Sequence, residues 1–110
     1  MNTNILTLAQ LKRDIIVGKT VYLIEYLVKD SKEKEFRNLD IKSQIKKRII
    51  SQTRQTSFAL GTDCNEKKIN SWSEYPKSKD VQYFKDGTFI FSIRDQDGEI
   101  FQKRIYKIEA

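Results

Sequence analysis

Runs of aromatic and β-branched residues fill the last third of the chain, and two Asp-Gly pairs separate them. The pairs stand at Asp86-Gly87 and Asp97-Gly98. Asp-Gly between such runs is a strong short-range signal for a hairpin turn. Residues 81–108 therefore predict three antiparallel strands in a meander. A two-residue turn at the first pair places Phe84 opposite Phe89, as an aromatic cross-strand pair.

The second turn of the meander allows two registers. A loop over residues 96–98, with a bulge at the glycine, sets Ile93 opposite Phe101. A strict two-residue turn sets Phe91 opposite Arg104 instead. We expect the longer loop, because it brings apolar side chains together across the strands.

Near the start of the chain the pattern changes to that of a short amphipathic helix over about residues 8–15. Thr7 is a candidate N-cap, and Leu8, Leu11 and Ile15 follow at helical spacing. So short a helix is not stable in isolation. Its apolar face is therefore expected to pack on the sheet.

The apolar run at residues 20–28 predicts a strand, with Val21, Leu23 and Glu25 on one face and apolar residues on the other. Such a strand is expected to be covered on both sides over part of its length. As an edge strand, it would also offer free backbone groups for pairing with a second copy, so a homodimer is one possible assembly.

The middle of the chain alternates between polar connections and short strands. Residues 29–47 are polar, and either a short helix over residues 40–47 or a strand extending back from residue 48 accounts for their few apolar positions. Residues 48–53 and 57–60 read as a hairpin, and residues 69–72 as another short strand.

These elements predict one α+β domain over residues 1–110. We expect a short N-terminal helix packed on a strongly bent, mostly antiparallel sheet of about six strands, as in an SH3-like barrel or a β-roll. Hydrophobic residues make up 38% of the chain and charged residues 33%, which allows one core.

Cysteine and histidine usage bounds the chemistry and the compartment. The single cysteine, Cys64, allows no internal disulfide, so a cytoplasmic location is expected. No apolar run is long enough for a membrane span, and no signal peptide pattern is present, so no membrane association is expected.

Enzymatic chemistry is not expected. The chain has no histidine, which removes the commonest general base and the commonest zinc ligand. The alternating acids of residues 95–99 resemble part of a calcium loop but lack its later ligands, and hairpin turn chemistry explains them better. We therefore predict a non-enzymatic binding module without a cofactor or a metal.

The net charge of +6 is unevenly distributed. Residues 32–54 carry eight basic and three acidic side chains, which is nearly all of the excess. Such a segment suits nucleic acid or an acidic protein surface, although a solvated, solubilising surface has the same composition.

Nucleic-acid binding is the first functional hypothesis, because small bent sheets bind single strands by stacking bases on exposed aromatic rings beside basic side chains. The basic candidates are Lys46, Lys47, Arg48 and Arg54, and the aromatic candidates are Tyr22, Tyr26 and Trp72.

Protein binding is the alternative hypothesis. Residues 72–77 place Trp72 and Tyr75 beside a proline in a predicted loop, and exposed Trp and Tyr are typical interface anchors. Trp72 could instead close one end of the predicted barrel.

The order of several motifs resembles a group of small uncharacterised proteins from prophages, plasmids and other mobile elements of Gram-positive bacteria. The motifs are Leu8-x-x-Leu11-Lys12-Arg13-Asp14-Ile15-x-x-Gly18-x-x-Val21, residues 52–60, Ser71-Trp72, Pro76-Lys77 and residues 86–89. The charged stretch at residues 29–47 departs from this pattern. The resemblance implies a bacterial cytoplasmic setting, no catalytic residues, and action on a host or phage component.

Overall fold

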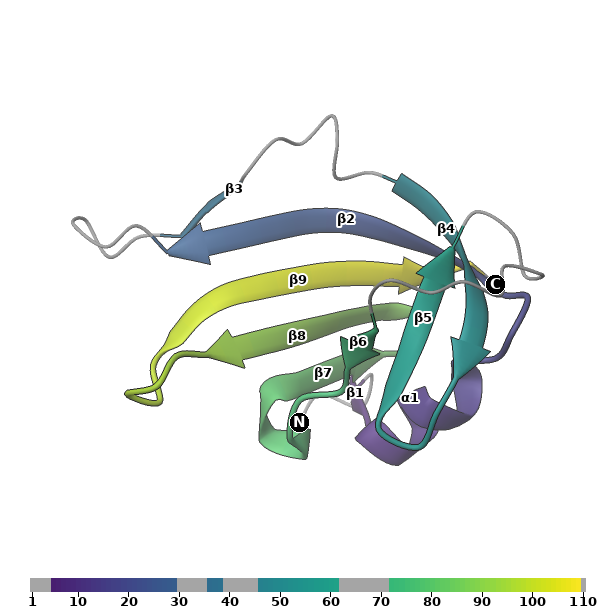
Figure 1. The fold of residues 1–110 in the computed structure, drawn as a ribbon, viewed down its shortest axis with the longest axis horizontal. Helices are drawn as coiled ribbons and strands as arrows, with labels where there is room; N and C mark the ends of the chain where they lie inside the picture. The colour runs from purple at the N-terminus through teal and green to yellow at the C-terminus, as the bar shows by residue number, and fades with distance from the viewer. Residues whose placement is uncertain (1–4, 30–35, 39–45, 62–71, 110) are drawn as a thin grey trace.

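The strands of the predicted meander lie within a single antiparallel sheet (Figure 1). The computed structural model describes residues 5–29, 36–38, 46–61 and 72–109. These contain one α-helix, α1 (Leu8–Asp14), and one 3₁₀ helix, η1 (Ser78–Asp80). The strands are β1 (Ile5–Leu6), β2 (Thr20–Lys29), β3 (Phe36–Asn38), β4 (Lys46–Thr53), β5 (Ser57–Gly61), β6 (Ser73–Glu74), β7 (Val81–Phe84), β8 (Thr88–Arg94) and β9 (Ile100–Ile108).

The order of the strands leaves the sheet open. It runs β1-β7-β8-β9-β2-β4-β5-β6, with β3 paired to β2, and every described pairing is antiparallel. The small α+β class is therefore confirmed, but the sheet has more than the six strands expected. The described pairings do not close a barrel.

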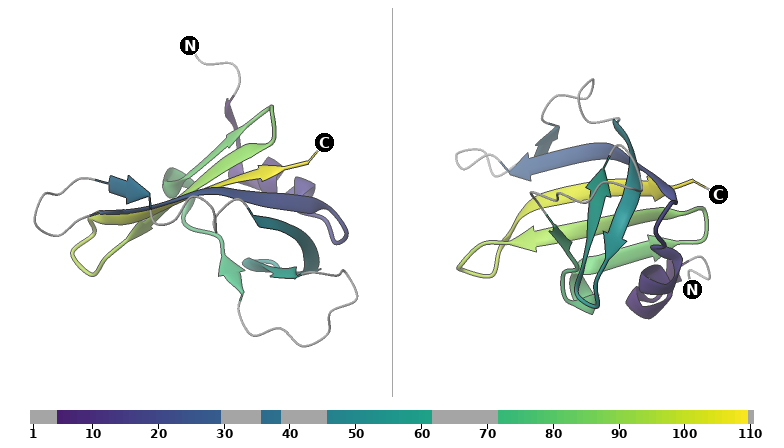
Figure 2. Two further views of the ribbon diagram at one scale, coloured as in Figure 1. Left: turned by 90° about the horizontal axis from the view of Figure 1, so that it is seen from above. Right: turned by 45° about the vertical axis from the view of Figure 1, so that its right-hand side comes forward.

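The sheet bends so far that its two halves pack on each other. β5 passes in front of β8 and β9 in Figure 1, although three strands separate β5 from β8 in the sheet order. The ring of Phe58 on β5 lies 6.5 Å from that of Phe89 and 6.2 Å from that of Phe91, both on β8. The other two views show the same fold-over (Figure 2). The core lies between these layers.

Helix α1 forms as predicted and covers one end of this core. Thr7 and Gln10 make a capping box: the Thr7 hydroxyl accepts from the Gln10 N–H at 3.2 Å, and the Gln10 side chain accepts from the Thr7 N–H at 2.7 Å. Leu11 is fully buried and Ile15 is 3% exposed. The helix is too short and too polar to cross a membrane, and it is the one α-helix that the described residues form.

The first hairpin of the meander differs from its prediction by one residue. Tyr83, not Phe84, pairs with Phe89. The connection holds three residues instead of two, because the Gly87 N–H donates to the Phe84 carbonyl at 3.0 Å and Gly87 adopts φ +95°. A turn followed by a left-handed glycine is the usual three-residue hairpin loop.

The second hairpin has the expected loop over residues 96–98, since the Asp95 N–H donates to the Glu99 carbonyl at 2.8 Å and Gly98 adopts φ +82°. A bulge between Ile93 and Arg94 then shifts the strands into the disfavoured register, with Phe91 opposite Arg104. This register sets Phe89 against Tyr106, and the two rings stack at 4.8 Å with 13° between their planes. The Phe89–Tyr106 pair thus provides an apolar contact between the strands, as the Ile93–Phe101 pair would have done in the other register. A bulge leaves Phe101 36% exposed.

Strand β2 is central, so the predicted edge-to-edge dimer loses its basis. β9 pairs along one side of β2, and β4 and β3 pair along the other. A bulge between Leu23 and Glu25 also corrects the predicted face, because Glu25 pairs with Ile105 while Leu23 pairs with Tyr106. Residues directly opposite in a sheet share a face, and neighbours along β9 do not. Glu25 therefore lies on the opposite face from Leu23.

The predictions for the middle of the chain are partly confirmed. β4 and β5 form the expected hairpin. β4 begins at Lys46, so the last two residues of the helix proposed over residues 40–47 belong to a strand that extends back from residue 48. Residues 39–45 lie outside the described residues, as do Cys64 and residues 69–71. Trp72, the last residue of the strand predicted over residues 69–72, is not in a strand, and β6 occupies the next two residues, Ser73–Glu74.

Candidate functional site

The structure separates the basic residues that the sequence grouped together. Lys47 pairs with Tyr22, and Arg48 pairs with Val21, so the two side chains point to opposite faces of the sheet. Lys46 pairs with Leu23 through its backbone, and its side chain lies outside the described part. The three residues therefore do not form one patch as a sequence run. Strand alternation is the physical reason.

Arg54 and Trp72 are brought together, at the far end of β4 from Lys47. The Arg54 guanidinium carbon lies 3.8 Å from the centre of the Trp72 ring, a cation–π contact. Trp72 is partly exposed and does not belong to the described core cluster. It therefore does not close an end of the core, which was the competing prediction.

Tyr75 lies at the edge of the core, where an interface anchor would be poorly exposed. Its ring is 5.2 Å from that of Phe58 and 6.1 Å from that of Phe91. The Lys12 ammonium lies 5.2 Å from the centre of the same ring. Burial raises the pKa of the Tyr75 hydroxyl to about 12. The Tyr75 ring packs against the core cluster, so Tyr75 is first a structural residue.

A row of side chains that the sequence did not reveal crosses four strands. Tyr22 on β2 lies directly between Lys47 on β4 and Lys107 on β9, and Lys107 in turn faces Thr88 on β8. Partners directly opposite in a sheet point to the same side. Tyr22 thus has a lysine opposite it on each neighbouring strand, and Tyr22 and Lys47 are the two residues of this row that the sequence had offered as candidates.

The row belongs to the face of the sheet that points away from the core. We call it the open face, and its described side chains are Thr20, Tyr22, Glu25, Leu27, Lys29, Phe36, Lys47, Ile49, Thr88, Ile90, Ser92, Lys103, Ile105 and Lys107. None of them belongs to the core cluster, whose members on β8 and β9 are the alternate residues Phe89, Phe91, Tyr106 and Ile108, with Ile93 packed against it. Among the described residues the core therefore uses one face of β8 and β9 and leaves the other.

A second aromatic ring lies toward the other end of the open face. The Lys103 ammonium is 4.9 Å from the centre of the Phe36 ring. Lys29 on β2 pairs with Phe36 and reaches Glu99 at 4.0 Å. The pattern Lys103-x-Ile105-x-Lys107 within a predicted strand was the signal that could have found this face, because it sets two lysines and an isoleucine on one side.

Carboxylates on or beside the open face are fewer than ammonium groups. Glu25 pairs with Ile105, between the rows that hold Lys103 and Lys107. Glu109, just beyond β9, accepts a 3.5 Å hydrogen bond from the Tyr22 hydroxyl. Glu99 lies beside Lys29, as noted above. Against these three carboxylates stand the lysines at positions 29, 47, 103 and 107, so the face carries a small positive surplus.

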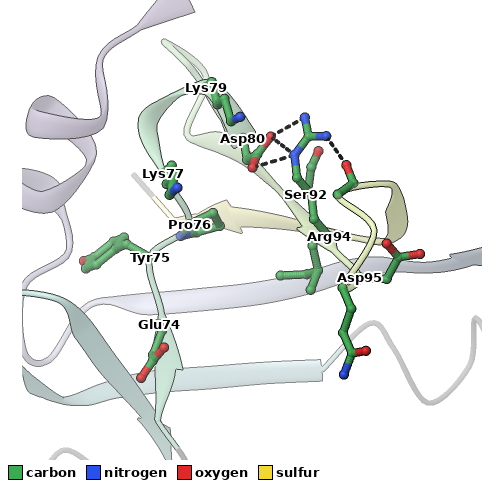
Figure 3. Close-up of a pocket in the computed structure, with 12 residues that line it drawn as sticks. Glu74, Tyr75, Pro76, Lys77, Lys79, Asp80, Ser92, Arg94 and Asp95 are labelled. Carbon is green, nitrogen blue, oxygen red and sulfur yellow. Dashed lines mark hydrogen bonds and ion pairs between the residues drawn. The ribbon is translucent and has the colours of Figure 1, made fainter.

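A cleft of about 480 Å³ lies on another part of the molecule, between the segment from Glu74 to Asp80 and the β8–β9 hairpin (Figure 3). The Arg94 Nε donates to both carboxylate oxygens of Asp80 at 3.0 Å, and Arg94 Nη2 lies 2.9 Å from Asp80 Oδ1. The hydrogen bond from Arg94 is the main reason that the pKa of Asp80 is lowered, and Asp80 raises the pKa of Arg94.

The acids of the β8–β9 turn serve the backbone. Asp95 Oδ1 accepts from the N–H groups of Asp97 and Glu99 at 2.9 and 3.0 Å, which is the expected turn chemistry. In the described part of the chain no group of three or more Asp, Glu or Cys side chains is placed to hold a metal ion.

Comparison of the chain with protein-family models, with curated proteins and with solved structures gave no match. The resemblance to mobile-element proteins thus stays a prediction. The geometry of the open face and of the cleft is the basis for the functional inferences below.

Proposed function

We propose that this protein is a non-enzymatic module that binds single-stranded nucleic acid on its open face. The observation that carries the proposal is the placement of Tyr22 between Lys47 and Lys107, on the side of the sheet that the core does not use. A base stacks on the tyrosine ring, and the two ammonium groups meet the phosphates on either side of it.

A second stacking position supports the same reading. Phe36 lies beneath the Lys103 ammonium, so each end of the open face combines one aromatic ring with at least one lysine. A single strand laid along β2 and β9 meets both rings. Duplex DNA keeps its bases stacked inside and offers no free base to either ring, so single strands are the preferred form.

The apolar side chains of the open face favour a binding surface over a merely solvated one. Ile90 and Ile105 are partly exposed between the lysine rows, and neither contributes to the core. A surface that only keeps a protein soluble needs no isoleucines at its centre. Of the two architectures expected, a β-roll fits this open, folded-over sheet better than an SH3-like barrel. A cytoplasmic location and a mobile-element origin belong to the same proposal.

The alternative, a protein-interaction module of a mobile element acting on a host or phage protein, has weaker support. Its two anchors were Trp72 and Tyr75. The Arg54 guanidinium covers one face of Trp72, and Tyr75 packs against Phe58. Neither residue offers the freely exposed ring that the alternative requires.

The test is a fluorescence anisotropy titration with a labelled oligothymidine of about 12 nucleotides at low and moderate salt. We expect binding that weakens steeply with salt. Tyr22→Ala should weaken it about tenfold, from the loss of one stacked base. Lys107→Ala should weaken it less and reduce its salt dependence, whereas Lys79→Ala, which removes an equal charge at the cleft, should leave it unchanged. Absence of binding at low salt, or equal losses in the Lys107 and Lys79 variants, would refute the proposal.

A further inference from the structure

Arg94 is held in one orientation at the wall of the cleft. The buried Asp80 carboxylate, 7% exposed, fixes its Nε and Nη2 as described above, and Arg94 Nη1 donates to the Gly98 carbonyl at 2.6 Å. A guanidinium restrained on two sides loses little freedom when it binds a further group. The side chain is nevertheless 36% exposed, so part of it faces the cleft and solvent.

The guanidinium retains unused hydrogen-bond donors. It has five N–H groups, and the contacts with Asp80 and Gly98 occupy one each on Nε, Nη2 and Nη1. One N–H is left on each terminal nitrogen. Two parallel donors on a planar fork match the two oxygens of a phosphate or carboxylate.

Two lysines add to the positive charge at this end of the cleft. Lys77 and Lys79 both line the cleft, and both act on Asp80 through their charge. Together with Arg94 they set three positive charges beside the Asp80 carboxylate at this end, while Glu74 and Asp95 also line the cleft and balance its charge as a whole. The ion pair alone needs neither lysine, because Arg94 already neutralises Asp80.

The two ends of the cleft differ in charge. Glu74 lies at the opposite end of the close-up from Lys79, and Pro76 lies between them (Figure 3). Ile93 adds a second apolar side chain to the lining. A ligand that fits this lining has an anionic group at one end, an apolar or aromatic middle, and hydrogen-bond donors at the other.

We propose that the cleft binds a phosphorylated small molecule of nucleotide size, with its phosphate on Arg94, Lys77 and Lys79. Hydroxyl or amino groups of the ligand point toward Glu74, and its ring lies along Pro76 and Ile93. The volume of about 480 Å³ lies within the usual range for small-molecule sites. Ser92 is the one described residue that the cleft lining shares with the open face, and the cationic residues of the two sites are different, so either proposal can fail without the other.

The experiment is an NMR titration of the isotope-labelled protein with inorganic phosphate and with AMP, at ionic strength held constant with sodium chloride. We expect saturable shifts of the Arg94 Nε–H signal and of the backbone amides of Lys77 and Lys79. AMP should bind several-fold more tightly than phosphate, because it also meets the apolar middle of the cleft and Glu74.

Matched variants separate a site from a general charge effect. The double variant Lys77→Ala with Lys79→Ala should weaken AMP binding about tenfold or more, as expected for the loss of two ionic contacts. Lys85→Ala, which removes an exposed lysine outside both the cleft lining and the open face, should leave AMP binding unchanged. All three positions are exposed on the surface, so the variants are expected to fold.

Three results would overturn the inference. Shifts that grow linearly without saturation, or that sodium chloride alone reproduces, would show that no phosphate site exists. Equal AMP affinity in the double variant and in the unmodified protein would show that Lys77 and Lys79 do not bind the phosphate. AMP binding no tighter than that of inorganic phosphate would refute a ligand of nucleotide size.

Discussion

The hydroxyl of Tyr83 donates a 2.5 Å hydrogen bond to the Asp14 carboxylate, and this contact joins the last residue of α1 to β7. Tyr83 is 5% exposed, and its ring is part of the core. The bond therefore connects the one described α-helix to the sheet at the point where the helix ends.

Removal of this hydroxyl should loosen the helix. Tyr83→Phe keeps the ring in the core and leaves the partly buried Asp14 carboxylate without its donor, which should lower the free energy of unfolding by about 1–3 kcal/mol. Urea unfolding measures the change. Tyr22→Phe is the matched control, since its hydroxyl makes a longer, exposed contact of 3.5 Å. If both variants lose the same stability, the Tyr83–Asp14 bond has no special role.

Two tyrosines should make the fold sensitive to alkali. Burial raises the pKa of Tyr75 from 10.0 to about 12, and burial together with Asp14 raises that of Tyr83 further. Because the folded-state pKa exceeds the unfolded one, the stability linked to these groups is complete below pH 10 and is lost as the pH rises from about 10 through the folded-state value.

The urea concentration at which half of the protein is unfolded should therefore decrease as the pH is raised from about 9 to about 11.5. The fall should be shallower in Tyr75→Phe, which cannot ionise. An equally steep fall in that variant would show that Tyr75 does not contribute to the alkaline loss, and Tyr83→Phe would then test the second tyrosine. Phenolate absorbance, followed in parallel, should show late ionisation of these two side chains.

Gly87 should tolerate a side chain less well than Gly98. Both have positive φ, +95° and +82°. A Cβ at Gly87 would lie 2.6 Å from the Ile108 carbonyl oxygen, whereas a Cβ at Gly98 would meet nothing within 4 Å. Gly98→Ala should therefore cost about 1–2 kcal/mol, from the backbone conformation alone. Gly87→Ala should cost clearly more, as thermal or urea unfolding would measure. Equal losses would mean that the Ile108 backbone moves aside freely.

The central acid of the open face offers a test that should strengthen binding. Glu25 is partly exposed and lies between the rows that hold Lys103 and Lys107. Glu25→Gln keeps its shape and removes a charge that repels phosphate, so affinity for oligothymidine should rise several-fold at low salt and less at high salt. Glu74→Gln, at the cleft, should have no such effect. Unchanged affinity in Glu25→Gln would argue that the strand does not cross this part of the sheet.

The elements that local sequence determines were predictable. Thr7 and Gln10 lie three positions apart and cap α1 through contacts within a single turn. The β4–β5 hairpin likewise depends on residues close together in the chain. Such signals need no knowledge of the rest of the fold.

The register of the long strands was not predictable in the same way. Phe89 finds an apolar partner in Tyr106 in one register and in Ile105 in the other, so hydrophobic matching alone did not decide between them. The bulge in β2 after Leu23 then reverses the face of Glu25, a change that no alternation pattern announces.

The candidate site depended on these long-range pairings. Lys47 and Lys107 flank Tyr22 only because β4 and β9 pair with opposite sides of β2. The basic segment pointed to Lys47 correctly as a surface residue, but a search by local charge could not find Lys107, which lies in a stretch of balanced charge.

The position of β9 also bears on the order of events during synthesis. β9 is the last described strand to leave the ribosome, yet it lies between β8 and β2 in the sheet. Val21 on β2 pairs with Ile108 on β9, and Ile108 is synthesised much later than Val21. Until then β2 lacks its longest neighbour, so the nascent chain cannot complete its sheet step by step. Folding of this domain should therefore wait until β9 has been made, and the unfinished chain depends on its many charges to avoid aggregation until then.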